Sequence, residues 1–125
     1  MAEEDLSTLL RTLTVSQRPG RYCFVDLADV KPGVTPAATV QEDGETTAVV
    51  LVQEVVGEVP EFIAAWLTLR VNSDLAAVGL TAAIASCLAF EGIACNVLAG
   101  KLHDHVLVPD IDARRAIGAI EELAR

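Results

Sequence analysis

The sequence predicts an α+β fold in which helices pack on one face of an antiparallel sheet. From residue 65 onward the pattern reads strand, helix, strand, strand, helix. Upstream, a strongly β-branched segment follows an Asp-Gly hairpin signal. The longest uncharged segment, residues 75–90, is shorter than the roughly 20 residues that a membrane span needs and fits a buried helix better.

The amino-acid composition limits both the residues that can form the core and the partners that the protein can bind. Hydrophobic residues make up 52% of the 125 residues but aromatic residues only 4%, so Ala, Val, Leu and Ile must fill the core. The net charge of −9 argues against partners such as nucleic acid and anionic membranes. The three cysteines, Cys23, Cys87 and Cys95, lie apart in apolar segments without CxxC spacing. With no secretion signal at the start, they predict reduced thiols in a cytoplasmic protein.

The first elements follow from periodicity and breakers. Residues 5–13 carry leucines at helical spacing and predict an amphipathic helix, which Arg18-Pro19-Gly20 should end. Residues 21–27 are apolar and β-prone and predict an interior strand. Residues 31–36 contain two prolines and a glycine and predict a loop.

A hairpin is expected next. Residues 38–42 and 46–53 flank an acidic turn that contains Asp-Gly, and the second arm is the most β-branched segment of the chain. A short helical turn is expected around residues 53–57. Residues 66–71 then alternate large apolar with polar side chains, which predicts a strand with Leu67 and Leu69 on its core face and Thr68 and Arg70 on a solvated or partner-facing side.

The C-terminal half is a helix, a hairpin and a second helix. Residues 80–91 are predicted to form a helix ended by Gly92, and residues 93–99 and 103–108 two strands around a turn. Residues 113–124 form the last helix, which Asp110 or Asp112 can cap. This order predicts a ferredoxin-like arrangement. Such a sheet needs a fourth strand beside the first, and residues 21–27 are the favoured candidate.

These residues carry a family likeness. The segment WLTLRVNSDLAAVGLTAAIASCLAFEGIACNVLAGKLHDHVLVP resembles the C-terminal half of small bacterial ACT-domain proteins, with their AVGL helix start, GI-x-x-N-V strand and HDH-x-x-VP strand. YCFVDL and TTAVVLVQEV resemble the N-terminal module of the same tandem proteins. The resemblance implies an ACT-type fold with an N-terminal module at 1–60 and a C-terminal module at 61–125 that share one core.

The resemblance also implies a function and a site. ACT domains are regulatory modules that bind amino acids, commonly between paired domains, and this module is similar to those of the animal cytosolic arginine sensors. The family's ligand contacts map to Val78, Gly79, Leu80, Gly100, Lys101 and Asp104. The sensors have a small polar and an aromatic residue where this chain has Gly100 and Lys101, so arginine itself is not implied.

The physical chemistry of two of these residues agrees with that mapping. Gly79 opens a helix whose first N–H groups are unpaired and favour an anion such as a carboxylate. Asp104 lies in an otherwise apolar strand and can pair with an ammonium group. The alternatives are a glycine that only permits close helix packing and an aspartate at a solvated edge.

Other polar residues have mainly structural interpretations. His103 and His105 are two apart on one strand and point to the face opposite Asp104, but no third ligand has convincing spacing, so no metal is predicted. Asn96 is expected to bond a neighbouring segment or a ligand. Residues 72–74 form a polar corner of turn and cap residues that can also line the mouth of the pocket.

No catalytic motif was found: the chain has no G-x-S-x-G, Walker loop or H-E-x-x-H. The sequence therefore predicts a non-enzymatic amino-acid-binding regulatory module, without cofactor, acting as a homodimer or through a partner. The alternative is a ligand-free dimerisation or protein-interaction module of the same fold. A small enzyme that uses His103 or His105 is a weaker third possibility.

Overall fold

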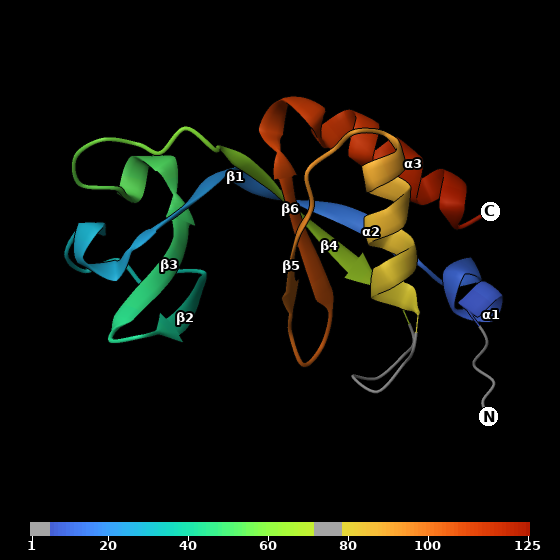
Figure 1. The fold of residues 1–125 in the computed structure, drawn as a ribbon, viewed down its shortest axis with the longest axis horizontal. Coiled ribbons are helices and arrows are strands. Elements are labelled where there is room, and N and C mark those ends of the chain that lie inside the picture. The colour runs from blue at the N-terminus through green and yellow to red at the C-terminus, as the bar shows by residue number, and fades with distance from the viewer. Residues whose placement is uncertain (1–5, 72–78) are drawn as a thin grey trace. The chain divides into compact units, whose positions relative to one another are not determined.

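A computed structural model of the chain describes residues 6–71 and 79–125 (Figure 1). The contacts divide the described residues into two compact units. Unit 1 contains the residues up to Arg18 and those from Ala65 to Arg125. Unit 2 is the segment Pro19–Ala64. A long strand, β1 (Thr14–Asp26), contributes its first residues to unit 1 and the rest to unit 2.

Unit 1 combines helices with strands, as the sequence predicts. Its strands are hydrogen-bonded in the order β1-β4-β6-β5. Strands β5 and β6 are antiparallel, in a register that pairs Asn96 with Leu107 and Ala99 with Asp104. The elements besides β1 are α1 (Leu6–Arg11), β4 (Ala64–Arg70), α2 (Leu80–Phe90), β5 (Asn96–Ala99), β6 (Asp104–Pro109) and α3 (Ala113–Leu123).

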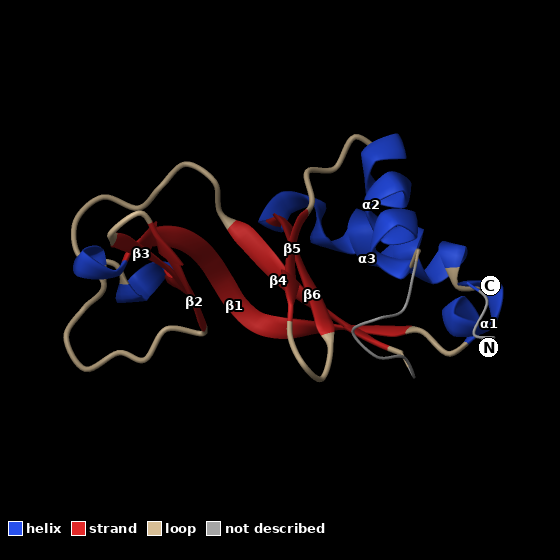
Figure 2. Cartoon of the chain, turned by 60° about the horizontal axis from the view of Figure 1, so that its bottom comes forward, coloured by secondary structure: helices blue, strands red, loops and turns tan. Residues whose placement is uncertain are grey.

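Helices α2 and α3 lie on one side of strands β4 to β6 (Figure 2). They bury an aliphatic core against the sheet, as the low aromatic content requires. Alternate residues of the strands face this core, because successive side chains of a strand point to opposite faces. The core contains Ala65, Leu67, Leu69, Leu80, Ile84, Leu88, Val106, Val108, Ala116 and Ile120.

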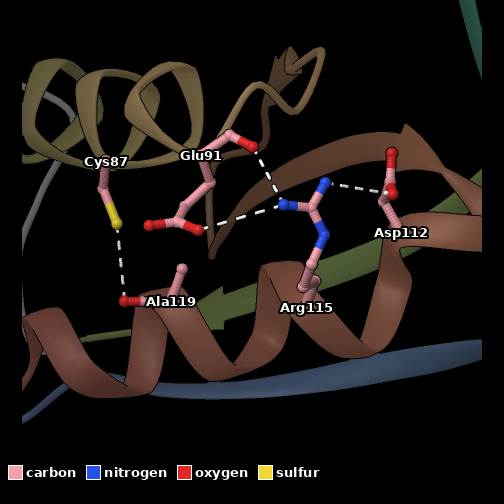
Figure 3. A network of polar contacts seen from close by, with 5 residues as sticks. All are labelled: Cys87, Glu91, Asp112, Arg115 and Ala119. Carbon is pink, nitrogen blue, oxygen red and sulfur yellow. Dashed lines mark hydrogen bonds and ion pairs between the residues drawn. The ribbon is translucent and has the colours of Figure 1, made fainter.

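Polar contacts between the two helices add to this packing (Figure 3). The Arg115 guanidinium of α3 donates to the backbone oxygen of Glu91 at 2.9 Å, just beyond the end of α2. It also pairs with the Asp112 carboxylate at 3.2 Å. One turn earlier on α2, the Cys87 thiol donates to the backbone oxygen of Ala119 at 3.4 Å. Asp112 stands at the N-terminus of α3, but its side chain makes no capping bond, so this one of the two expected caps is wrong.

Unit 2 is a small antiparallel sheet with strand order β2-β3-β1. Strands β2 (Ala38–Glu42) and β3 (Glu45–Leu51) form the predicted hairpin. Asp43 and Gly44 form its two-residue turn with positive φ of 39° and 86°, as a mirror-image turn requires. The core of unit 2 contains Cys23, Ala48, Val50 and Val55. Short 3-10 helices lie at Leu27–Asp29 and Val52–Glu54, the second close to the helical turn expected at 53–57.

The strand predicted at 21–27 begins seven residues earlier than expected. Thr14 to Gly20 continue it, so Pro19 and Gly20 lie inside β1 and do not separate a helix from a strand. This position of the strand favours glycine, because its φ is 103° and a Cβ there would collide with the Leu51 side chain. Strand β1 is the neighbour of β4. Its share of unit 1 ends at Arg18, upstream of the segment chosen from the sequence.

The side of residues 66–71 expected to be solvated or partner-facing is buried within the chain at Thr68. Leu67 and Leu69 face the helix-side core as expected, but Thr68 on the other face is only 7% exposed and Trp66 only 3%. Arg70 is exposed, as expected. Both faces of β4 are therefore buried over most of its length. Smaller differences are a first helix that ends at Arg11 and a strand β5 that begins at Asn96 and not at residue 93.

Candidate functional site

The start of α2 has the geometry expected of Gly79. Gly79 precedes the helix with a φ of 97°, in the left-handed region that favours glycine. Among the described residues, a Cβ there would meet only Leu6 of α1, at 3.8 Å, so the backbone conformation and not crowding with these residues selects glycine. The Leu80 side chain is buried in the core, which leaves its backbone N–H as the group available to a ligand. The first turn of α2 holds no acidic side chain that would repel an anion.

Asp104 begins β6 on the face that the helices cover. By the two-residue period of a strand it shares this face with Val106 and Val108, which both pack into the core with α2 and α3. The Asp104 side chain is half-buried. Gly79, Leu80 and Asp104 therefore belong to the same side of the unit 1 sheet.

The predicted contacts Gly100 and Lys101 lie in the turn between β5 and β6. The Gly100 N–H donates to the backbone oxygen of His103 at 3.0 Å. A Cβ on Gly100 would lie 2.9 Å from that oxygen and 3.2 Å from His105 Nε2, so Gly100 packs against the histidine side of the hairpin. Lys101 is exposed in the turn. The predicted contact Val78 and the polar corner at 72–74 lie outside the described residues.

His105 lies at the centre of a polar cluster on the opposite face. Its Nδ1 is 3.2 Å from Trp66 Nε1 and 3.1 Å from Thr68 Oγ1. Because an indole N–H only donates, Nδ1 accepts this bond and the imidazole is neutral with its proton on Nε2. The two rings also pack, with centroids 5.2 Å apart and planes at 54°.

The surroundings keep His105 neutral. Burial lowers the pKa of its imidazole, and the neighbouring His103 lowers it further. Asp104 opposes that shift, and Arg18 and Arg70 add to it. An additional proton on the ring would also turn Nδ1 into a donor that faces the indole N–H.

Two cations belong to the same cluster. The Arg70 guanidinium donates from Nη1 to His103 Nε2 at 2.9 Å. The Arg18 guanidinium lies over the Trp66 ring, 4.8 Å from its centroid. Sequence reasoning placed His103 and His105 on one face correctly. It missed their partners, although Trp66, Thr68 and Arg70 have the same two-residue spacing.

The remaining candidates have structural roles. Asn96 donates to the backbone oxygen of Leu107 at 3.4 Å, which is the structural alternative considered for it. All three cysteines are free, and burial raises the pKa of each thiol, with Glu91 adding to the shift at Cys87. These thiols are therefore protonated and weakly nucleophilic at neutral pH.

A cavity of about 270 Å³ opens elsewhere in unit 1. None of the five predicted contact residues that the structure describes lines it. Its walls come from the start of β1 and the end of α3: Leu13, Thr14, Val15, Ile120, Glu121, Ala124 and Arg125.

Residues 6–71 and 79–125 contain neither a metal-binding cluster nor a membrane-spanning helix. No group of three or more His, Cys, Asp and Glu side chains there is arranged to hold a metal ion. None of the helices in that part of the chain is long and apolar enough to cross a membrane.

Known proteins and structures share this fold. Residues 1–55 and residues 61–122 each match a model of the ACT domain. A Vibrio cholerae protein of unknown function, described as a possible transport protein, is 32% identical, with a TM-score of 0.81 over 98% of both chains. An Agrobacterium tumefaciens protein has a TM-score of 0.62 over 90% of this chain and 89% of its own, and its 18% identity bears on the fold alone. No curated protein matches the chain significantly.

The two ACT-domain matches together span most of the sequence, and the mixture of helices and antiparallel strands is consistent with that family. ACT domains are regulatory modules that bind small molecules and are not catalytic. The chain belongs to the ACT-domain family.

Proposed function

We propose that this protein is a non-enzymatic amino-acid sensor, a pair of ACT modules at residues 1–60 and 61–125. The observation that carries the proposal is the match of both halves of the chain to the ACT domain. A tandem of regulatory modules with no catalytic motif in the sequence fits ligand sensing better than turnover. The ligand is a zwitterion, because a molecule without net charge is not repelled by a chain of net charge −9.

The start of α2 holds the carboxylate in this proposal. The first N–H groups of a helix lack intrahelical partners, and the helix dipole favours an anion beside them. The left-handed conformation of Gly79 lets the chain turn into the helix without a side chain over those groups. Val78 and the N–H of Leu80 complete this end of the site.

Asp104 holds the ligand ammonium. Its carboxylate lies on the helix-covered side of the sheet, where half-burial strengthens a charge-assisted bond. The turn at Gly100 and Lys101 forms the rim, with the Lys101 ammonium exposed toward solvent. Because an ammonium and a carboxylate are recognised at separate ends, the site selects free amino acids over simple carboxylic acids.

Binding changes the behaviour of a second protein or a second copy of this chain. A ligand shifts an equilibrium only by its differential affinity for the two states. The ligand must therefore bind the associated form and the free form of this protein with different affinities. We assign a cytoplasmic homodimer as that assembly, with the ligand near its interface and no cofactor.

The test is a thermal-shift screen of the twenty amino acids on protein that has been denatured and refolded to remove carried-over ligand. An amino acid present at 100 times its Kd stabilises the folded state by about 2.7 kcal/mol. Asp104→Asn should abolish the shift because it removes the ammonium partner. Asp43→Asn is the matched control, since the same charge is lost in the β2–β3 turn, where asparagine tolerates the positive φ.

A flat screen of the refolded wild-type protein would reject amino-acid sensing. The alternative, a ligand-free dimerisation or interaction module, predicts that result together with an unchanged dimer in sedimentation experiments. A response that survives in Asp104→Asn would place the ligand somewhere other than the assigned site.

A further inference from the structure

The side of the unit 1 sheet that faces away from α2 and α3 carries an unusual set of side chains. We call it the helix-free face and define it by Arg18, Trp66, Thr68, Arg70, His103 and His105. These residues alternate with those that enter the helix-side core: Val15 in β1, Leu67 and Leu69 in β4, and Val106 in β6. Direct contacts join them across the strands, through the ring pair of Trp66 and His105 and the Arg70–His103 bond.

The helix-free face is cationic in a strongly acidic protein. Two of the nine Lys and Arg residues and both histidines of the chain lie on it. The four strand segments of unit 1 contain a single acidic residue, Asp104, and it points to the other face. Both arginines of these strand segments therefore lie on the helix-free face, although acidic residues outnumber basic ones by 18 to 9 in the chain.

Arg70 has donors to spare on this face. Its guanidinium carries five N–H groups, and its contact with His103 Nε2 uses one nitrogen. Within residues 6–71 and 79–125 it forms no ion pair with a carboxylate. Exposed guanidinium groups with free donors match the geometry of carboxylate and phosphate oxygens.

His103 shows that the cluster is incompletely satisfied. Because Nε2 accepts from Arg70, the neutral ring carries its proton on Nδ1. That nitrogen is buried and has no hydrogen-bond partner in the described parts of the chain. A buried donor without a partner is costly, and a small rotation of the ring toward an added acceptor would relieve the cost.

We propose that the helix-free face binds a small molecule through an oxyanion, held by Arg70 and His103 beside the Trp66 and His105 pair. The Arg18 guanidinium over Trp66 adds a second positive charge at the edge of this site. The site is distinct from the amino-acid site of the proposed function, because Asp104 lies on the opposite side of the sheet. It therefore does not depend on that proposal.

Trp66 is the only tryptophan of the chain and reports on this site directly. The experiment titrates the protein at pH 7.5 with inorganic phosphate and, separately, with acetate, at constant ionic strength maintained with sodium chloride. We expect a saturable change in Trp66 fluorescence. Saturation by phosphate alone identifies a tetrahedral oxyanion, whereas saturation by acetate identifies a carboxylate.

Arg70→Gln should weaken the apparent affinity by about tenfold or more, since a charge-assisted pair is lost. Arg114→Gln is the matched control, because it removes the same charge from an exposed position on α3 and should leave the response unchanged. His103→Gln removes the second contact and tests the site if the Arg70 variant does not fold. Asp104→Asn should keep this response while it loses the response to amino acids.

Three results would overturn the proposal. The first is a fluorescence change that is linear and equal in phosphate, acetate and chloride. The second is a saturable change that folded Arg70→Gln and His103→Gln proteins both retain. The third is equal weakening by Arg114→Gln, which would indicate attraction by the overall charge and not a site.

Discussion

The two faces of the unit 1 sheet differ in what holds them together, although the same strands supply both. On the helix-covered face, Leu67 and Leu69 pack with aliphatic side chains of α2 and α3 and make no polar contact. On the helix-free face, Trp66 and Thr68 are nearly as buried, yet both bond His105. Burial alone therefore does not separate a packing surface from a binding surface. The hydrogen bonds and the cations on the helix-free face separate the two.

The largest effect that this comparison predicts is on stability, from the helix-covered face. Leu67→Ala removes a fully buried side chain from the centre of β4 and should lower the free energy of unfolding by about 2–5 kcal/mol. Ile111→Ala, at a position 89% exposed, should change it by less than about 0.5 kcal/mol. Denaturant unfolding measures both. Equal losses in the two variants would contradict the assigned core.

An intermediate effect is expected at Gly100. Gly100→Ala places a Cβ against the backbone oxygen of His103 and the His105 ring, and such overpacking should cost about 1–3 kcal/mol. Gly118→Ala is the contrasting variant, because α3 has open space at that position. It should stabilise the protein by roughly 0.5–1 kcal/mol through its better helix propensity. A lower melting temperature for Gly100→Ala and a higher one for Gly118→Ala would confirm the crowding at Gly100. An unchanged melting temperature for Gly100→Ala would contradict it.

The smallest expected effect is a pH dependence from the helix-free face. The pKa of His105 is lowered in the folded protein, chiefly by burial, from an ordinary value of 6.5. The unfolded chain therefore binds this proton more readily, and stability falls as the pH drops below about 6.5. The loss ends once the pH is below the folded pKa, where both states are protonated.

Fluorescence of Trp66 and denaturant unfolding between pH 7.5 and 5 measure this dependence. His105→Asn should reduce the slope of stability against pH and flatten the acid transition in Trp66 fluorescence. The asparagine amide oxygen can still accept from the Trp66 N–H. The variant therefore removes the titrating proton of His105 and keeps the hydrogen bond. An unchanged slope in His105→Asn would assign the pH dependence to other groups.

Much of the fold could be predicted because its signals are local. The Asp43-Gly44 turn specifies a hairpin through two positive φ angles, and Gly79 and Gly92 mark the ends of α2. The start of β1 could not be predicted in this way. The Pro19-Gly20 pair is typical of a chain break, but in the fold both residues lie inside β1. The residue that lies against Gly20 is Leu51, from a strand distant in the sequence.

The same limit applies to the candidate sites. Alternation predicted correctly that His103 and His105 share one face, where they contact Thr68 and Arg70. It could not predict that Thr68, assigned to a solvated or partner-facing side, is buried within the chain, because a period of two tells which side a residue faces and not what covers that side. The pairing of Trp66 with His105 joins residues 39 positions apart and requires the strand order of the folded sheet. The amino-acid site at Gly79 and Asp104 stays a prediction.

The most direct test of amino-acid sensing is an NMR titration of isotopically labelled protein with the amino acid that stabilises it most. Binding at the assigned site predicts amide shifts that saturate together and are largest at Gly79, Leu80 and Asp104, with Trp66 and Thr68 nearly unmoved. Shifts that concentrate at Trp66 and Arg70, or that leave Gly79 and Asp104 in place, would contradict the assignment of the sensor to the helix-covered face.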